Sequence, residues 1–407
     1  MRLQHLALVD FRNYAAAEWS PSPGANVLLG SNGAGKTNLL EAIHLVVTGV
    51  SPRAGRERDL VRWGREACSV RAQVVRDEFS GALDCQVVWD RQQGKSVRRG
   101  GKALTGAGRT AVLGGAVLFS PGDLDLVKGP PSSRRDYLDL AAAKTLPRYR
   151  GLLRRYGTAL AHRNRLLADA ASGRSRHLSL SELQPWTQQL ITLGGEVLRH
   201  RLWALSGLAA PARAAYARLS DSGEALTLTY VPAAGQAEPE TAGMAVHPAN
   251  PPTTVLPGWA ADHPPSPAAT AAHLAQAFAE RQADELARGL TLVGPHRDEL
   301  ILSIAGAPAR VFGSQGEQRS VALSLRLAEN VFLRQALQDT PLLLLDDVFS
   351  ELDARRRMGL LGLLREAGEG HQTFLTGTDL AGVPVEGFAP MALFRVAEGR
   401  IAPADGH

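Results

Sequence analysis

The chain has 407 residues, of which 44% are hydrophobic and 21% are charged, and its formal net charge is +5. This composition is typical of a globular protein of two or three domains and argues against disorder. No run of 18 apolar residues occurs, so we expect no membrane-spanning helix and no membrane partner. Two cysteines are too few for a disulfide framework or a cysteine-rich zinc site. Since no signal-peptide pattern occurs either, we expect a cytoplasmic protein.

The first part of the chain alternates strands with turns. The strands that we predict here lie at 3–9, 26–29, 66–76, 82–90 and 116–119. The segments 66–76 and 82–90 alternate apolar and polar side chains, which is typical of antiparallel strands. A helical pattern begins after the glycine-rich loop that ends at residue 37, and we expect it to run to about residue 47.

The pattern changes to helix after Pro130-Pro131. The helices predicted in the rest of the chain lie at 134–146, 148–170, 181–205, 212–219, 270–288, 317–337 and 354–366. The strands predicted there lie at 226–231, 290–293, 300–304, 341–345 and 373–376. Residues 232–269 are rich in Pro, Ala and Gly without periodicity, which predicts a long loop or linker. The apolar run at 341–345 predicts a parallel strand that is buried on both faces.

Residues 30–37, GSNGAGKT, match the phosphate-binding loop pattern G-x-x-x-x-G-K-[ST] at every fixed position. The required strand precedes the loop and the required helix follows it, which disfavours a chance glycine-rich turn. Glycines let backbone N–H groups approach a polyphosphate, and the helix dipole adds positive charge. Lys36 is expected to reach the β- and γ-phosphates, and Thr37 to ligate Mg²⁺. The predicted nucleotide-binding residues of this segment are Gly30, Ser31, Asn32, Gly33, Ala34, Gly35, Lys36, Thr37 and Asn38.

Two carboxylates follow the apolar run at 341–345. A carboxylate at the end of a buried strand beside a phosphate loop is a common place to hold Mg²⁺. We assign that role to Asp346, acting through water, and expect Asp347 to orient or deprotonate the attacking water. The predicted catalytic residues are therefore Lys36, Asp346 and Asp347, and the predicted metal ligands are Thr37 and Asp346.

A third element, GSQGEQR at 313–319, opens the helix predicted at 317–337. Taken alone, Ser314 and Glu317 fit a capping box, which would be the ordinary interpretation. Their position ahead of the carboxylate strand favours a second phosphate-binding segment, with Ser314, Gly316 and Glu317 as nucleotide contacts. With SELD at 350–353, the four elements match the plan of ATP-binding cassette ATPases. In that plan two heads enclose two ATP molecules, each between the phosphate loop of one head and the signature of the other.

Six motifs resemble those of the RecF family of bacterial recombination mediators: FRNY, GSNGAGKTN, LFSPGDLDLVKGPPSSRRDYLD, LVGPHRDEL, FGSQGEQR and LLLLDDVFSELD. They keep the family's order from Phe11 to Asp353, nearly the whole chain. The resemblance implies an α/β fold: an ABC-type P-loop ATPase head, similar to SMC heads, with an inserted, mostly helical second lobe. It also implies ATP and Mg²⁺ as cofactors, and places Arg12 and Asn13 near the nucleotide.

The resemblance further implies a function. An ATP-dependent homodimer would bind double-stranded DNA and junctions of single- and double-stranded DNA, and with RecR and RecO it would help load RecA at gaps. We expect the head at 1–124 and 290–407 and the helical lobe at 125–289. Asp347 stands where the general cassette plan has Glu, which predicts slow hydrolysis. The usual Gln is replaced around Ser120-Pro121.

A basic segment at 95–176 contains 17 Lys or Arg residues against 5 Asp or Glu residues. Such a density can neutralise DNA phosphates without reading sequence, although a solvated helical surface would be the ordinary alternative. A second candidate patch is formed by Arg53, Arg56 and Arg58. The bases of the first segment include Arg98, Arg99, Lys102, Arg109, Lys128, Arg134, Arg135, Arg148, Arg150, Arg154, Arg155, Arg163 and Arg165.

Two other functions share parts of this pattern. The ATPase subunit of a membrane transporter would carry the same cassette elements, but its signature would usually lie much closer to the phosphate loop. The long intervening segment here contains the basic region, which favours DNA as a partner. A long-armed chromosome-organising ATPase is disfavoured, because 130–290 is too short and too often interrupted by Pro and Gly for sustained heptads.

Overall fold

The computed structural model describes residues 1–76, 81–105, 115–172, 179–220, 223–233, 265–367, 371–379 and 390–404. Arg109 and most of the loop expected at 232–269 lie outside these residues. The chain forms two compact units. Unit 1 comprises Met1–Asp123, Arg218–Asp221 and Leu323–His407, and unit 2 comprises Leu124–Ala217 and Ser222–Ala322. None of the helices within the described ranges has the length and apolar character needed to span a bilayer.

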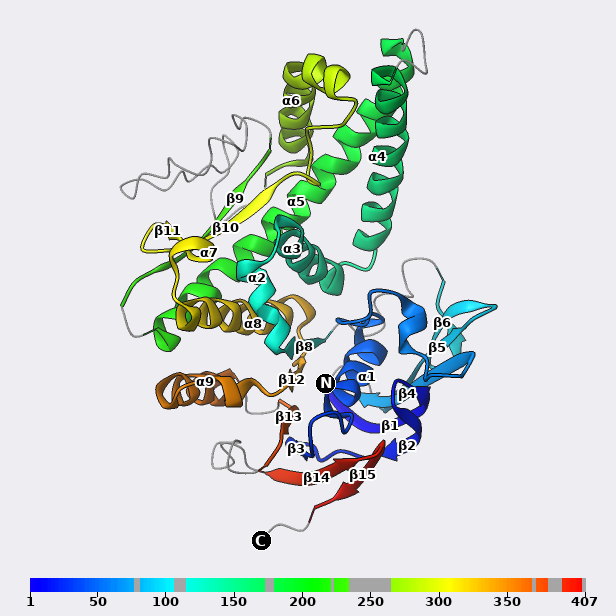
Figure 1. The fold of residues 1–407 in the computed structure, drawn as a ribbon, viewed down its shortest axis with the longest axis vertical. Coiled ribbons are helices and arrows are strands. Elements are labelled where there is room, and N and C mark those ends of the chain that lie inside the picture. Colours follow the sequence, from blue (N-terminus) through cyan, green and yellow to red (C-terminus); the bar gives the residue numbers. More distant parts are fainter. Residues whose placement is uncertain are drawn as a thin grey trace. The chain divides into compact units, whose positions relative to one another are not determined.

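Unit 1 contains two six-stranded sheets (Figure 1). The first is antiparallel, in the order β2-β1-β4-β5-β6-β7. The second has the order β15-β14-β3-β13-β12-β8, and all its pairings are parallel except β15 with β14. Their bounds are β1 (Arg2–Phe11), β2 (Tyr14–Trp19), β3 (Ala25–Leu29), β4 (Ala67–Val75), β5 (Ala82–Asp90), β6 (Gly94–Arg99), β7 (Lys102–Ala103), β8 (Ala116–Phe119), β12 (Leu342–Leu345), β13 (Thr373–Gly377), β14 (Met391–Ala397) and β15 (Arg400–Pro403).

The core of unit 1 is organised around helix α1 (Lys36–Thr48), which contacts strands of both sheets. Its apolar side chains, including Leu39 and Ile43, are completely buried. Every residue of α1 from Leu39 to Thr48 is buried, as expected of a helix covered on both sides, and the polar side chains of Glu41 and His44 have hydrogen-bond partners. Because α1 begins directly after the phosphate loop, this packing holds the loop at the end of β3. The remaining helical elements of unit 1 are η1 (Glu57–Leu60), η4 (Val348–Glu351) and α9 (Ala354–Ala367).

Unit 2 is mostly helical and has one small antiparallel sheet in the order β11-β10-β9. Its strands are β9 (Leu226–Val231), β10 (Glu299–Ile304) and β11 (Ala307–Pro308). Its helices are α2 (Asp125–Lys128), α3 (Pro131–Thr145), α4 (Tyr149–Ala171), α6 (Pro267–Arg288) and α7 (Ala309–Phe312), with most of α5 (Leu180–Leu219). Three elements cross the unit boundaries: η3 (Pro121–Leu124), α5, whose residues from Arg218 belong to unit 1, and α8 (Gln315–Leu337).

The LVGPHRDEL motif serves the fold of unit 2. Asp298 is buried and accepts hydrogen bonds from the Tyr230 hydroxyl at 2.7 Å and from the Ala233 N–H at 2.9 Å. Arg201 donates to the Pro295 carbonyl at 2.5 Å. Burial lowers the pKa of His296 to about 4, and its Nδ1 lies 2.7 Å from the hydroxyl of Tyr156. Buried polar groups need partners, and this motif supplies them where the helices meet β9 and β10.

Most predicted elements are confirmed, including the parallel strand β12 and the antiparallel pair β4–β5. The strand predicted at 290–293 is wrong. The N–H groups of Thr291 and Leu292 bond to the side chains of Asn164 and Glu285 instead of to a neighbouring strand. The division predicted between 205 and 212 is also wrong, since α5 continues through Pro211. The strands that the sequence patterns did not predict are β2, β6, β7, β11, β14 and β15.

The boundaries between the two units can be compared with the expected ones. The first boundary falls after Asp123, next to the division expected at 124. The second differs from the expected division at 290, because residues up to Ala322 group with unit 2. The reason is that β10 pairs with β9 and contacts α3, so the segment that follows it is held in unit 2.

Candidate functional site

The phosphate loop lies between β3 and α1, and Lys36 folds back over it. The Lys36 ammonium donates to the carbonyl oxygens of Gly30 at 2.6 Å and Ser31 at 3.0 Å. Burial lowers the pKa of Lys36, while the nearby carboxylates of Asp347 and Asp346 oppose that shift. The positive charge is therefore held at the loop, where an anionic ligand would complete its coordination.

The FRNY turn between β1 and β2 braces the end of the loop. Asn13 donates through Nδ2 to the Ala34 carbonyl at 3.1 Å, and the Tyr14 hydroxyl donates to the Gly35 carbonyl at 2.9 Å. A Cβ at Gly35 would lie 2.5 Å from Asn13 Nδ2, and the φ of Gly35 is +113°. Both the conformation and the close approach therefore require glycine here. Asn38 donates to Asn13 Oδ1 at 2.9 Å, which ties the first turn of α1 to the same brace.

The two carboxylates predicted from the sequence lie at the end of β12, beside the start of α1. Asp346 Oδ1 accepts hydrogen bonds from the hydroxyls of Thr37 and Thr376, each at 2.9 Å. Burial raises the pKa of Asp346, and the two hydroxyl donors oppose that shift. Thr376, at the end of β13, was not predicted from the sequence. The feature that could have indicated it is a polar residue near the end of a buried strand.

Asp347 follows in a left-handed conformation, with φ of 52°. Its N–H donates to Thr376 Oγ1 at 2.9 Å, and its carbonyl accepts from the Ser350 hydroxyl at 2.8 Å. A non-glycine residue in this region of φ is uncommon and is often found at functional sites. These bonds turn the chain sharply after Asp346, so that two successive carboxylates can serve different positions.

The residues fit Mg²⁺. Thr37 and Asp346 present two hard oxygen atoms 2.9 Å apart, and only Oδ1 of Asp346 is used by the hydroxyls. Mg²⁺ typically binds through one or two such protein ligands and completes its shell with phosphate oxygens and water. The described residues contain no cluster of three or more His, Cys, Asp or Glu side chains for an all-protein metal site. The donor set of Thr37 and Asp346 suits an ion shared with a phosphate ligand.

The side-chain contacts of Arg12 and Arg53 were not predicted from the sequence. The Arg12 guanidinium donates to both carboxylate oxygens of buried Glu41, at 2.9 and 2.8 Å, and to the Asp59 carbonyl. It therefore anchors α1 to the FRNY turn. Arg53, expected in a DNA-binding patch, lies 3.4 Å from Asn38 Oδ1. The feature of the sequence that could have indicated an arginine partner here is Glu41, a carboxylate among the apolar residues of α1.

The predicted signature segment begins α8 in unit 2. Ser314 donates through its N–H and its hydroxyl to Glu317 Oε2, both at 2.7 Å, and the Glu317 N–H donates back to Ser314 Oγ at 3.3 Å. These bonds form the capping box that the sequence allowed. The capped helix presents its N-terminus at the protein surface, where it can attract an anion.

The structure divides the basic residues of 95–176 into two groups. Arg134 and Arg163 form ion pairs with Glu299 and Glu285, at 2.8 and 2.6 Å, and both arginines are buried. They hold unit 2 together and are not available to DNA. The neighbouring tyrosines are also buried, so they offer no surface for base stacking: Tyr137, Tyr149 and Tyr156.

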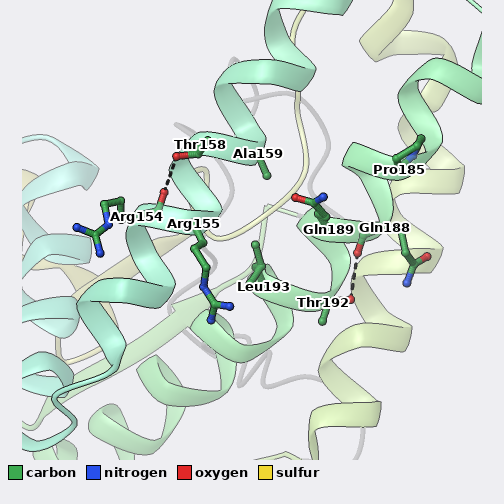
Figure 2. A pocket seen from close by; sticks show the side chains of 9 residues that line it. All are labelled: Arg154, Arg155, Thr158, Ala159, Pro185, Gln188, Gln189, Thr192 and Leu193. Carbon is green, nitrogen blue, oxygen red and sulfur yellow. Dashed lines mark hydrogen bonds between the residues drawn. The ribbon is translucent and has the colours of Figure 1, made fainter. Parts of the chain in front are cut away.

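Arg154 and Arg155 on α4 belong to the second group. Both are exposed, and neither has an acidic partner among the residues that the structure describes. They line a groove of about 670 Å³ between α4 and α5 (Figure 2). Its other walls carry Thr158, Ala159, Pro185, Gln188, Gln189, Thr192 and Leu193, with no carboxylate among them. The charged side chains that line this groove are therefore both cationic.

Curated relatives match the chain over its full length. The family model described as "AAA domain" matches residues 5–110. The DNA replication and repair protein RecF of Heliobacterium modesticaldum is 35% identical over 402 residues, covering 99% of each chain. The protein of the same name from Symbiobacterium thermophilum is 37% identical over 410 residues, covering 100% of this chain and 99% of its own.

Solved structures also include a RecF protein that is similar to this chain over nearly its full length. A structure described as the recombination mediator protein RecF with ATP in the RecFOR pathway is 28% identical, with a TM-score of 0.81, and covers 99% of this chain and 98% of its own. An SMC head bound to the C-terminal winged-helix domain of ScpA is 14% identical, with a TM-score of 0.54, and covers 100% of this chain and 98% of its own. The second likeness concerns the fold alone.

Proposed function

The chain belongs to the RecF family, and we propose that it is an ATP-binding protein of the RecFOR pathway in DNA repair, in which ATP switches a DNA-binding dimer. The observation that carries this proposal is the cluster of Lys36, Thr37 and Asp346, with Thr376 bonded to the same carboxylate. At one end of the parallel sheet, the cluster brings together the ammonium of Lys36, the two metal ligands Thr37 and Asp346, and the glycine-rich phosphate loop. A bound triphosphate needs these three features together.

The residues of unit 1 would act in sequence on the nucleotide. The loop N–H groups and the N-terminus of α1 bind the phosphates, and Lys36 exchanges the Gly30 and Ser31 carbonyls for phosphate oxygens. Thr37 and Asp346 would hold Mg²⁺, which neutralises phosphate charge when bound. Asp347 would orient or deprotonate the attacking water. The side chain of Asp347 is shorter than that of the Glu usual at this position. Its shorter reach toward the attacking water supports slow hydrolysis, which suits a switch.

The phosphate loop supplies donors to only one side of a triphosphate. We infer that Ser314, Gly316 and the N-terminus of α8 of a second copy supply the other side, as in the cassette plan. The exposed, capped start of α8 supports this role. ATP would then join two copies, and its hydrolysis would release them.

Sedimentation velocity of the native chain tests this switch. We expect a monomer without nucleotide or with ADP, and a dimer with ATP and Mg²⁺, with duplex DNA favouring the dimer further. A slowly hydrolysed ATP analogue serves as the control that separates binding from turnover. A chain that binds ATP but remains a monomer with both ATP and duplex DNA would contradict the proposal.

We further propose the partners that the family implies: double-stranded DNA, junctions of single- and double-stranded DNA, and RecR with RecO in loading RecA at gaps. The transporter alternative is not favoured, because the full-length relatives are DNA replication and repair proteins. The exposed arginines of α4 support DNA binding through phosphates, without sequence preference.

The double variant Arg154→Glu/Arg155→Glu is expected to bind duplex DNA at least tenfold more weakly than the native chain. For each DNA phosphate that the variant no longer neutralises, the slope of log affinity against log salt should become shallower by about 0.9. Fluorescence anisotropy over a series of salt concentrations measures both effects. Arg281→Glu is the matched control, because Arg281 of α6 is paired with Asp284 at 3.1 Å. An unchanged affinity and salt slope in the double variant would place the DNA-binding surface elsewhere.

A further inference from the structure

Two large apolar side chains are exposed immediately before the signature segment. Val311 and Phe312 of α7 are 70% and 72% exposed, whereas Ala309 of the same helix is completely buried. Burying such a pair would remove apolar surface from water, and exposed aromatic and aliphatic side chains of this kind are typical of contacts with another protein. The mechanism proposed above makes no use of them.

The pair is held rigidly. Gln318 is buried, and its Nε2 donates to the carbonyls of Ala309 at 3.0 Å and Arg310 at 3.3 Å. The Gly313 N–H donates to the Ala309 carbonyl at 3.1 Å. A Cβ at Gly313 would lie 2.7 Å from that carbonyl, so glycine allows the tight connection between α7 and α8. α7 also contacts β10, β11 and α2. Because the backbone is fixed before binding, burying these side chains would cost little conformational entropy.

We propose that Val311 and Phe312 form an apolar contact with a second copy of this chain in the ATP-bound dimer. The inference rests on the proposed function, in which Ser314 faces the nucleotide of the second copy. Phe312 precedes Ser314 by two residues, so their Cα atoms are at most about 7.6 Å apart. A surface that approaches Ser314 closely enough to share a phosphate therefore also approaches Phe312.

The chemistry of the pair favours a protein surface as its occupant. Neither side chain can bond to a DNA phosphate, and α8 directly after the pair carries the polar groups that would meet the nucleotide. The apolar contact would exclude water beside those groups, which strengthens their interactions with a phosphate. ATP would supply the charge that aligns the two copies, and the pair would supply apolar contact area at the edge of the same interface.

The test is the dimer dissociation constant of the full chain in ATP and Mg²⁺, measured by sedimentation equilibrium. Phe312→Ser is expected to raise it at least tenfold, Val311→Ser to raise it less, and Phe312→Leu to retain most of the native affinity. The affinity of each variant monomer for ATP should be unchanged. Leu180→Ser is the matched control, because Leu180 is 55% exposed at the start of α5 in the same unit.

The outcomes separate this inference from the proposed function. A native chain that does not dimerise with ATP overturns both. If the native chain dimerises and Phe312→Ser gives the same dissociation constant, the inference alone is overturned. A weaker dimer in Phe312→Ser matched by an equally weak dimer in Leu180→Ser also overturns it, because the effect would then follow from any added surface hydroxyl. A weakening confined to positions 311 and 312, with recovery in Phe312→Leu, supports it.

Discussion

Lys36→Met is expected to weaken ATP binding at least 100-fold and to abolish ATP-dependent dimerisation. The native ammonium is nearly buried and is held 2.6 Å from the Gly30 carbonyl, at the place where the β- and γ-phosphates would lie. Methionine has a similar length but carries no charge and donates no hydrogen bond, so the phosphates are deprived of a charge-assisted hydrogen bond in a partly desolvated site. Titration with a fluorescent ATP analogue measures the affinity, and sedimentation velocity measures the dimer.

The matched control is Lys102→Met, because Lys102 is an exposed lysine of the short edge strand β7. It removes the same charge from unit 1 but lies outside the phosphate loop, and it should bind ATP as the native chain does. Lys36→Met also leaves the Gly30 and Ser31 carbonyls without their donor, so a thermal melt must show that the variant is folded. A folded Lys36→Met chain that dimerises with ATP as well as the native chain would rule out the proposed switch.

Asp347→Asn is expected to slow ATP hydrolysis by a factor of about 10² to 10⁴, the usual contribution of a general base, and to accumulate the ATP-bound dimer. Asparagine keeps the size and the left-handed backbone that Asp347 adopts, with φ of 52°, but it cannot accept a proton from water. ATP binding should persist, since the phosphate loop and Asp346 are unchanged. Single-turnover hydrolysis and sedimentation with ATP measure the two effects.

Asp346→Asn is the comparison that separates the two carboxylates. We assign Asp346 to Mg²⁺ because its Oδ1 accepts from Thr37, so that variant should lose Mg²⁺-dependent affinity for ATP instead of turnover alone. If Asp347→Asn hydrolysed ATP at the native rate, the water would have to be activated by another group. If both variants lost affinity equally, the division of roles between the carboxylates would be wrong.

The basic residues show the limit of inferring a binding surface from charge in the sequence. Arg134, Arg154, Arg155 and Arg163 lie in one arginine-rich segment, and the sequence offers all four to DNA. In the fold, Arg163 is buried against Glu285, which lies more than a hundred residues further along the chain. Arg154 and Arg155 instead face solvent. Helical periodicity places side chains on faces, but it does not say which distant carboxylate covers a face.

Local sequence patterns were enough to predict the phosphate loop, the carboxylate strand and the capped start of α8. A glycine-rich turn, an apolar run and a capping box each depend on residues within a few positions of one another, so they can be recognised without the fold. The RecF-like order of the motifs could be recognised in the same way.

Which residues share a site depends on how distant segments pack together. β13 lies between β3 and β12 in the parallel sheet, so Thr376 meets Asp346 while Thr37 reaches the same carboxylate from α1. Arg12 pairs with Glu41, because α1 packs against the first sheet. Such contacts join residues that are tens to hundreds of positions apart, and they depend on strand order, on which no local pattern carries information.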